Sequence, residues 1–444
     1  MPNVSPLAVE ETTPRPHRPI VAGFSARALA EAIVAWGGQP IVIDHFTDHD
    51  CRELAFAWYQ IVNWGDHSAS FSASLTPIIE KIAKLPTAGP VPWLLLGGGT
   101  ENWPALLREL QRHFRVLGPN LEQLAQLRDY RFWREAVVGS GIHFPESYLT
   151  SSRTRPPELP DRQPDHQPDR QADSVWLWKP TRGAGGVSIR RMSAPGVLAA
   201  SLSTPTAPVL CQQKIDGRSL GAHCILAPEV VRLLGVTEAW SLDDWPAPKE
   251  FIYRGSWGPL PVAEYHTQQI LKLCRHVQAA TGYIGWLQID FIEDATGQLW
   301  LLELNPRWAA GMEIMLLAGI NPVDYHLAAW QIPTGHIPTG QAATWRLSQP
   351  LPPVTVQYGK GVVYAEQPLR LSTDKLARLH ALSRTNFVDL PALEMAGETI
   401  AAGQPVLTVR TACNSHIDEQ ARRKDILAKL RRLLAVAWKV LDEA

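Results

Sequence analysis

Residues 286–307 read Trp-Leu-Gln-Ile-Asp-Phe-Ile-Glu-Asp-Ala-Thr-Gly-Gln-Leu-Trp-Leu-Leu-Glu-Leu-Asn-Pro-Arg, and the fold is decided here. Two apolar runs, at 286–293 and 298–304, flank the turn-forming tetrapeptide Asp-Ala-Thr-Gly at 294–297. Such a turn between two strand-like runs is typical of a β-hairpin. We therefore predict a hairpin whose second strand ends in Glu-Leu-Asn-Pro-Arg.

The polar side chains of this hairpin are expected on one face. If Glu293 pairs with Gln298, Asp290 lies diagonally across from Glu303, at a backbone separation of roughly 7–8 Å. Side chains alternate along a strand, so Asn305 shares the face of Glu303. Two carboxylates and an amide form an oxygen-rich site that suits Mg²⁺.

The alternative is an ordinary solvated hairpin with its polar residues facing water. The predicted register places three apolar side chains on the same face: Ile292, Leu299 and Leu301. This composition favours a partly buried face, and buried carboxylates need a cation or a partner.

The composition is that of a globular protein with a sizeable core. The chain has 444 residues, is 45% hydrophobic and 19% charged, and carries a net charge of −1, which allows two to four domains. The charge balance indicates neither a nucleic-acid nor a membrane partner, and no apolar run reaches the length of a membrane span. The five cysteines are scattered without a Cys-x-x-Cys pair, which favours a reducing compartment and a cytoplasmic location. Residues 1–18 lack the apolar core of a signal peptide and are predicted to be a disordered tail.

Residues 19–120 predict a Rossmann-like α/β domain. A strand at 19–22, a helix at 23–36 and a strand at 40–44 form a βαβ unit, from which parallel strands follow. Further strands and helices are expected at 52–63 (helix), 71–84 (helix), 91–97 (strand), from 103 (helix) and at 116–118 (strand). No Gly-x-Gly-x-x-Gly motif is present, so dinucleotide binding is not predicted. Asp44 is expected to cap the following segment rather than to bind a ribose.

Residues 121–340 contain a second stretch whose residues could bind a ligand. After a helical stretch at 121–138, the repetitive polar tract at 151–174 predicts a disordered insertion. A strand then delivers Lys179 to a turn composed of Arg182, Gly183, Ala184, Gly185 and Gly186. Glycines let backbone N–H groups point at anionic oxygens, and a lysine beside them can neutralise a phosphate. The motif is not a Walker A loop, and on its own it fits a glycine-rich hairpin without a ligand equally well.

Two more regions complete the chain. A strand near 209–213 ends at Gln213, Lys214 and Ile215, whose side chain or backbone groups would suit an adenine edge. Residues 341–444 combine short strands with an amphipathic helix at 415–443 and predict a small β-rich C-terminal domain.

Taken in order, these segments resemble the ATP-grasp superfamily over most of residues 20–335. The most specific part is Glu-Leu-Asn-Pro-Arg at 303–307. Residues 355–412 resemble the tail of bacterial proteins described as predicted ATP-dependent carboligases related to biotin carboxylase. Some members of that group are associated with tetrahydromethanopterin-linked one-carbon metabolism. The resemblance implies an N-terminal Rossmann-like (pre-ATP-grasp) domain, a two-lobed ATP-binding region and the small C-terminal domain.

The resemblance also implies ATP and Mg²⁺ (or Mn²⁺) as cofactors, with a role for each motif. These roles are phosphate contacts for Lys179, a lid for residues 182–186, the adenine hinge for Gln213, Lys214 and Ile215, and metal ligation for Asp290, Glu303 and Asn305. Arg307 would steady the transferring phosphoryl group. The family's second phosphate lysine has no counterpart after Asp129, and either Arg128 or Arg131 would take its place.

The implied activity is ligation of a carboxylate to an amine through an acyl phosphate, with ATP converted to ADP and phosphate. This chemistry needs no protein nucleophile, which fits the lack of a Ser/His/Asp or Cys/His pattern. Two alternatives stay open: a biotin-carboxylase-like enzyme that forms carboxyphosphate, and a nucleotide-binding protein without catalysis. The chain has no Ala-Met-Lys-Met type biotin site, so such a carboxylase would need a separate carrier. The expected partners are small-molecule carboxylates and amines, and a homo-oligomer is compatible with the sequence.

Overall fold

The computed structural model describes residues 17–61, 69–85, 92–150, 175–183, 185–192, 208–332, 346–382, 384–414 and 418–442. Residues 1–16 of the predicted tail, the predicted insertion at 151–174 and Ala184 lie outside the described residues.

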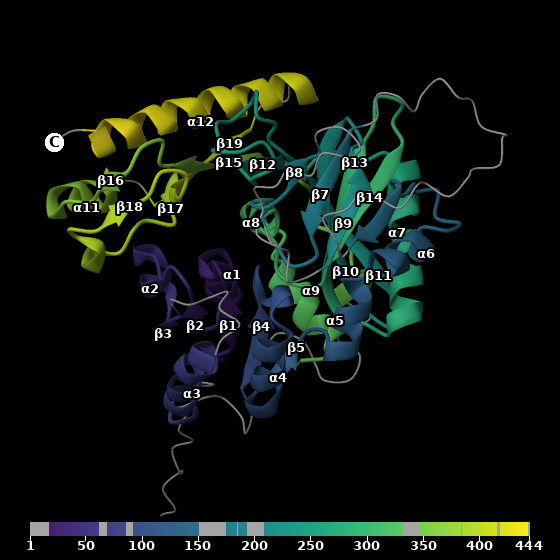
Figure 1. Ribbon diagram of the computed structural model, residues 1–444, viewed down its shortest axis with the longest axis horizontal. Coiled ribbons are helices and arrows are strands. Elements are labelled where there is room, and N and C mark those ends of the chain that lie inside the picture. The colour runs from purple at the N-terminus through teal and green to yellow at the C-terminus, as the bar shows by residue number, and fades with distance from the viewer. Residues whose placement is uncertain are drawn as a thin grey trace, which may run out of the picture.

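The N-terminal part of the chain is a parallel five-stranded sheet in the order β3-β2-β1-β4-β5, coloured purple to blue in Figure 1. Its strands are β1 (Ile20–Gly23), β2 (Ile41–Asp44), β3 (Ala57–Gln60), β4 (Trp93–Leu96) and β5 (Arg115–Leu117). Its helices are α1 (Arg27–Trp36), α2 (His49–Leu54), α3 (Ala69–Ala83) and α4 (Pro104–His113), with the 3₁₀ helix η1 (Thr100–Asn102) after β4. The predicted parallel α/β sheet is confirmed.

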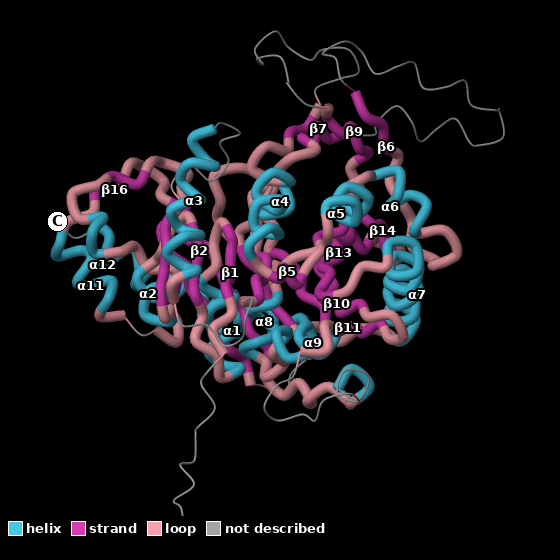
Figure 2. The backbone as a smooth tube through the Cα atoms, turned by 90° about the horizontal axis from the view of Figure 1, so that it is seen from below, coloured by secondary structure: helices cyan, strands magenta, loops and turns pink. Residues whose placement is uncertain are grey.

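Both faces of this sheet are covered by helices, which explains why the central strands β1 and β4 contain no polar or charged residue. Ile20 and Leu94 lie in one core cluster with residues of α3 and α4. Val21 and Leu95 point to the other face and lie in a cluster with residues of α1. Figure 2 shows α3 and α4 on one side of the sheet and α1 on the other.

The predicted helix at 52–63 is wrong, because α2 ends at Leu54 and residues 57–60 form the edge strand β3. Aromatic residues such as Trp58 and Tyr59 pack well on a half-exposed strand, and this preference outweighs the helical pattern. Asp44 accepts hydrogen bonds from the N–H groups of Ala26 and Thr47, so it holds the turn after β2 but does not cap α2, whose N-cap residue is Asp48.

The predicted helical stretch at 121–138 divides into α5 (Leu121–Leu127) and α6 (Tyr130–Ala136). The Asp129 side chain accepts a hydrogen bond from the Arg131 N–H and starts the second helix. An N-cap of this kind favours a new helix start at this point. The break leaves Arg128 at the C-terminus of α5.

Two further sheets form the predicted two lobes. The small lobe is a four-stranded sheet in the order β6-β9-β7-β8, made of β6 (Ser147–Thr150), β7 (Trp176–Pro180), β8 (Arg190–Arg191) and β9 (Val209–Gln213). The large lobe is an antiparallel eight-stranded sheet in the order β14-β13-β10-β11-β12-β15-β19-β17. Its strands are β10 (Arg218–Leu226), β11 (Val231–Ala239), β12 (Gly255–Gly258), β13 (Gly285–Glu293), β14 (Leu299–Asn305), β15 (Gln357–Tyr364), β17 (Phe387–Val388) and β19 (Pro405–Cys413).

Helices cover both faces of the large sheet. Helix α7 (Glu264–Thr281) packs on β10 and β11. Helices α8 (Met312–Leu317) and α9 (Pro322–Ala329) contact the large sheet and α1 as well. They therefore form the layer that joins the N-terminal sheet to the large lobe.

The C-terminal strands belong to the large lobe, because β15, β17 and β19 extend its sheet. The remaining C-terminal elements are β16 (Leu369–Arg370), α11 (Thr373–His380), η3 (Leu393–Met395), β18 (Thr399–Ile400) and α12 (Glu419–Asp442), and α12 lies along β15 and β19 (Figure 1). The domain boundaries at residues 120 and 340 stay predictions, although one sheet spans the second of them. None of the described helices is both long and apolar enough to cross a bilayer.

Candidate active site

Strands β13 and β14 form the predicted hairpin, but the predicted register is wrong by one residue. Glu293 pairs with Leu299, and the register shifts between Asp290 and Phe291. A bulge of this kind places an extra residue in one strand and re-aims the side chains beyond it. As a result, Asp290 lies directly opposite Glu303 rather than diagonally across from it.

Because of the bulge, Leu299 and Leu301 do not share the face of the carboxylates, contrary to the prediction. Phe291 pairs with Leu301, and Leu299 follows two residues earlier on the same face of β14. All three side chains are buried in the core. They lie on the face opposite Asp290 and Glu303, so the two strand faces separate core packing from the polar site.

The carboxylates are held by neighbouring amides. The Nδ2 of Asn305 donates to Asp290 Oδ2 at 2.9 Å and to Glu303 Oε1 at 3.0 Å. The Nε2 of Gln288 donates to Asp290 Oδ1 at 2.5 Å. Asp290, Glu303 and Asn305 are thus brought together as predicted, and the sequence reasoning missed Gln288.

The pKa values of the two carboxyls move in opposite directions. Burial and the adjacent Glu303 charge raise the pKa of Asp290 to about 8. Burial also opposes ionisation of Glu303, but the positive charges of Arg128 and Lys179 outweigh it and lower its pKa to about 2. Ionisation of Asp290 is therefore disfavoured while Glu303 is charged, since two close buried carboxylates cannot both ionise without a cation.

Lys179 faces this pair from the small lobe. Strand β7 carries it, and its Nζ donates to Gln212 Oε1 at 3.1 Å. Burial lowers the pKa of Lys179, and the charges of Glu303 and Asp290 partly offset this effect. Lysine and carboxylates from different lobes thus line the same space.

The glycine-rich loop after β7 contacts two other parts of the molecule. The Gly183 N–H donates to Asn102 Oδ1 at 3.1 Å, and the Tyr253 N–H donates to the Gly185 carbonyl at 2.9 Å. Gly186 has a φ of 73°, and a Cβ there would collide with the Phe251 carbonyl oxygen. Only glycine fits this close approach.

Arg128 is the second cation of the site. Its guanidinium donates to Asn305 Oδ1 at 3.2 Å and to Asn102 Oδ1 at 3.3 Å. Arg131, the other predicted substitute for the family lysine, is exposed and paired with Asp129 at 2.7 Å. Of the two arginines that the sequence left as alternatives, Arg128 therefore lies at the site and Arg131 does not.

Arg307 links the hairpin to the N-terminal sheet. Its Nε donates to Glu101 Oε1 at 2.9 Å, and the Trp308 N–H donates to the Leu96 carbonyl at 2.9 Å. Burial opposes the charge of Arg307, but Glu101, Asp290 and Glu303 together raise its pKa.

Glu101 and Asn102 both lie in η1, directly after β4, and the sequence reasoning missed them. The only signal was the Gly-Gly-Gly run at 97–99 after a buried strand, a place where open α/β sheets bind ligands.

The predicted adenine-hinge residues lie at the end of β9. Gln213 pairs with Trp176, and the Lys214 N–H donates to the Val175 carbonyl at 2.8 Å. The Lys214 amide is therefore not free to donate to an adenine in this conformation. Gln212, rather than Gln213, is the side chain that contacts Lys179, and the sequence reasoning missed it.

The carboxylate oxygens of Asp290 and Glu303 are donors that a hard cation prefers, whereas Asn305 turns its Nδ2 to them and its Oδ1 to Arg128 in this structure. Within the part of the chain that the structure describes, no three His, Cys, Asp or Glu side chains are close enough to hold a metal ion. Asp290, Glu303 and Asn305 supply only part of the six oxygens that Mg²⁺ prefers. Phosphate and water oxygens would complete the set.

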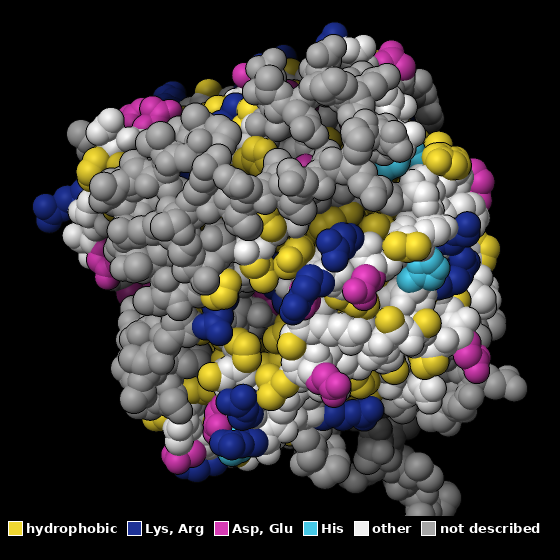
Figure 3. Space-filling view, turned by 45° about the vertical axis from the view of Figure 1, so that its right-hand side comes forward, with side chains coloured by type: hydrophobic (Ala, Val, Ile, Leu, Met, Phe, Trp, Pro, Cys, Tyr) yellow, Lys and Arg dark blue, Asp and Glu magenta, His cyan; other side chains and the backbone are white. Residues whose placement is uncertain are grey.

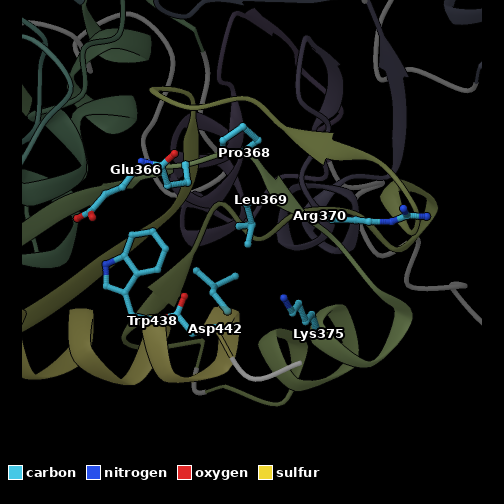
Figure 4. Close-up of a pocket in the computed structure, with 9 residues that line it drawn as sticks. Glu366, Pro368, Leu369, Arg370, Lys375, Trp438 and Asp442 are labelled. Carbon is cyan, nitrogen blue, oxygen red and sulfur yellow. The ribbon is translucent and has the colours of Figure 1, made fainter.

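A surface cavity of about 400 Å³ lies elsewhere, between β16, α11 and α12. Figure 4 shows Trp438 and Leu369 beside it, with Lys375 and Asp442 at its margin. It contains none of the predicted site residues, so we assign it no part in the chemistry. On the face drawn in Figure 3, basic and acidic side chains are interspersed.

Comparisons with known proteins point to the same fold. Residues 147–311 match the family model of the ATP-grasp domain. No curated protein matches the chain.

Several solved structures are similar over nearly the whole chain. An N5-carboxyaminoimidazole ribonucleotide synthetase in complex with ADP has a TM-score of 0.60 and 14% identity, covering 96% of this chain and 98% of that one. The L-amino acid ligase from Bacillus licheniformis has a TM-score of 0.59 and 13% identity, covering 95% and 98%. The biotin carboxylase domain of Hydrogenobacter thermophilus 2-oxoglutarate carboxylase, solved with MgADP, has a TM-score of 0.58 and 14% identity, covering 89% and 86%. The predicted ATP-grasp fold is confirmed.

Proposed function

We propose, on the premise that residues 147–311 form an ATP-grasp domain, that this chain joins a carboxylate to an amine and converts ATP to ADP and phosphate. The observation that carries the proposal is the convergence of three cations on the Asp290–Glu303 pair. Lys179 comes from the small lobe, Arg128 from α5, and Arg307 from the end of the hairpin. Such a mixture of cations and carboxylates suits transfer of a phosphoryl group held by a metal.

In the proposed mechanism the chain positions charges and supplies no nucleophile. When bound, Mg²⁺ would neutralise and align the β and γ phosphates. Asp290, Glu303 and Asn305 would hold it, while Lys179 and Arg128 would neutralise phosphate oxygens. The substrate carboxylate attacks the γ-phosphorus to give an acyl phosphate and ADP. The amine then attacks the acyl carbon and releases phosphate.

The glycine-rich loop would exclude water during these steps. Its contacts with Asn102 and Tyr253 hold it against both the N-terminal sheet and the large lobe. An acyl phosphate hydrolyses readily in water, so a closed loop protects it.

A second candidate is an ATP-dependent carboxylase that activates bicarbonate. The similarity to the biotin carboxylase domain supports it. In that case the same cations would stabilise carboxyphosphate. The one-carbon association and the cytoplasmic location remain predictions, and five buried cysteines that form no disulfide are compatible with a reducing compartment.

A screen of ADP release tests the proposal. The protein is incubated with MgATP and pools of carboxylates and amines, each pool also tested alone. Release that requires one carboxylate and one amine supports the ligase, whereas stimulation by bicarbonate alone favours the carboxylase. Binding of MgADP without release in any pool would contradict both enzymatic functions. Lys179→Ala provides the control, because it should abolish release that arises at this site.

A further inference from the structure

Glu101 occupies a distinctive place at the carboxyl edge of the N-terminal sheet. It lies in η1, directly after β4, and the order β3-β2-β1-β4-β5 puts the topological switch point between β1 and β4. Ligands of open α/β sheets bind at this edge, next to the switch point. A Cβ added to Gly98, in the preceding loop, would meet no atom within 4 Å. The loop therefore borders open space.

Among the described residues, only one oxygen of the Glu101 carboxylate has a hydrogen-bond partner. Oε1 accepts the hydrogen bond from Arg307 Nε, and the side chain is only 2% exposed. Oε2 is fully buried and accepts no hydrogen bond within the described part of the chain. A buried charged oxygen without a donor costs free energy. This oxygen therefore suits a ligand that brings a cationic N–H donor.

Arg307 connects Glu101 to the carboxylates of the proposed metal site. The same guanidinium that pairs with Glu101 also interacts with Asp290 and Glu303. One arginine side chain thus separates the Glu101 carboxylate from the carboxylates proposed to hold the metal.

We propose that Oε2 of Glu101 binds the ammonium group of the amine substrate beside the acyl phosphate. The ammonium gives one proton to this carboxylate, the neutral amine then attacks the acyl carbon, and its second proton leaves with the released phosphate. The inference rests on the proposed function and deepens it, because it names a protonated amine, such as the amino group of an amino acid, as the ligand of this oxygen. A purely structural Glu101 would need only Oε1 to hold Arg307, and Oε2 would then remain buried without a donor.

The test compares wild type with Glu101→Gln, which keeps an oxygen for Arg307 and removes the negative charge. Thermal unfolding is followed in three states: without ligand, with MgADP, and with MgADP plus one amine from a panel of ammonium, methylammonium and the twenty standard amino acids. Glu109→Gln is the matched control, because Glu109 lies in the neighbouring helix α4 and pairs with Arg112 and His113 of the same helix. Glu101→Asp retains the charge on a shorter side chain.

We expect MgADP to raise the Tm of all four proteins. At least one amine should raise the Tm of wild type and of Glu109→Gln further, and titration should show that it binds Glu101→Gln roughly ten- to a hundredfold more weakly. Glu101→Asp should bind it with intermediate affinity. Equal amine affinity in wild type and Glu101→Gln, or no amine that stabilises the MgADP form of wild type, would overturn the inference. A missing MgADP shift would instead count against the proposed function.

Discussion

At the residue scale, the opposite pKa shifts of Asp290 and Glu303 follow from the placement of two cations. Arg128 and Lys179 lower the pKa of Glu303 to about 2, whereas burial and the Glu303 charge raise that of Asp290 to about 8. Glu303 is therefore the permanent anion of the pair. It is therefore the carboxylate that we expect to contribute most to the proposed binding of Mg²⁺.

Changing Glu303 to Gln should remove Mg²⁺-dependent ADP release by a factor on the order of 10² or more, because several kcal/mol of transition-state stabilisation depend on the metal. The matched control is Glu293→Gln, at the far end of the same hairpin, where the carboxylate pairs with Arg218. Release is measured at several Mg²⁺ concentrations. Near-normal turnover by Glu303→Gln would exclude this residue as a metal ligand.

The two arginines flanking Asp129 give a second test at this scale. Arg128 contacts Asn305 and Asn102, whereas Arg131 is exposed. Arg128→Ala should weaken MgADP binding roughly tenfold or more, because it removes a charge-assisted phosphate contact, and Arg131→Ala should leave it unchanged. Calorimetry measures both affinities. Equal effects of the two substitutions would contradict the placement of Arg128 at the phosphates.

Several site residues could be predicted from sequence because each lies in a local pattern. Lys179 precedes a glycine-rich turn, and Glu303, Asn305 and Arg307 share five consecutive positions. Glu101 could not be predicted in this way. Its partner Arg307 is 206 residues away, and only the packing of the N-terminal sheet against the hairpin brings them together.

At the element scale, the hairpin shows the limit of strand alternation. The turn at 294–297 and both strands were predicted correctly, but the bulge after Asp290 was not. Side chains still alternate before and after a bulge, but the pairing of the two strands shifts by one residue across it. Core packing of Phe291 against Leu301 decides the register here, and that packing is not visible in one strand alone.

Helix α9 gives a prediction about pH. His326 is buried, its Nδ1 accepts from the Trp286 N–H at 3.1 Å, and its Nε2 contacts the Leu117 carbonyl at 3.1 Å. Burial lowers the pKa of His326 to about 3, against about 6.5 in an unfolded chain. Between these values the unfolded state binds a proton that the native state does not. His326 therefore lowers the stability as pH falls below about 6.5, by up to about 1.4 kcal/mol per pH unit.

Urea unfolding of wild type and His326→Gln between pH 7 and pH 4 checks this prediction. Glutamine does not titrate. In the variant, the unfolding free energy should therefore change less steeply with pH, by the amount that the uptake of about one proton on unfolding contributes in wild type. His223, whose pKa burial also lowers to about 3, should contribute its own slope in both proteins. Identical slopes in wild type and variant would mean that His326 is protonated in the folded protein.

At the scale of the whole molecule, a buried charge network joins the N-terminal sheet to the large lobe. Glu313 of α8 is fully buried and lies 2.7 Å from Arg27 of α1, 2.6 Å from Lys360 of β15 and 3.1 Å from Arg410 of β19. Burial opposes its charge, yet these three cations hold the pKa of Glu313 well below its usual value. No local pattern predicts this network, since its members come from four elements that lie between residues 27 and 413.

The network should therefore govern the stability of the assembled chain more than any surface ion pair. Glu313→Gln leaves Lys360 without the carboxylate that its Nζ contacts, and removing one partner of a buried ion pair costs about 3–5 kcal/mol. Glu53→Gln is the control, because Glu53 forms a surface pair with Arg384 and its side chain is 56% exposed, where such pairs contribute about 0–1 kcal/mol. Urea denaturation should show a markedly lower midpoint for Glu313→Gln and little change for Glu53→Gln. Similar midpoints for the two variants would show that the contact between the N-terminal sheet and the large lobe is held by apolar packing rather than by these charges.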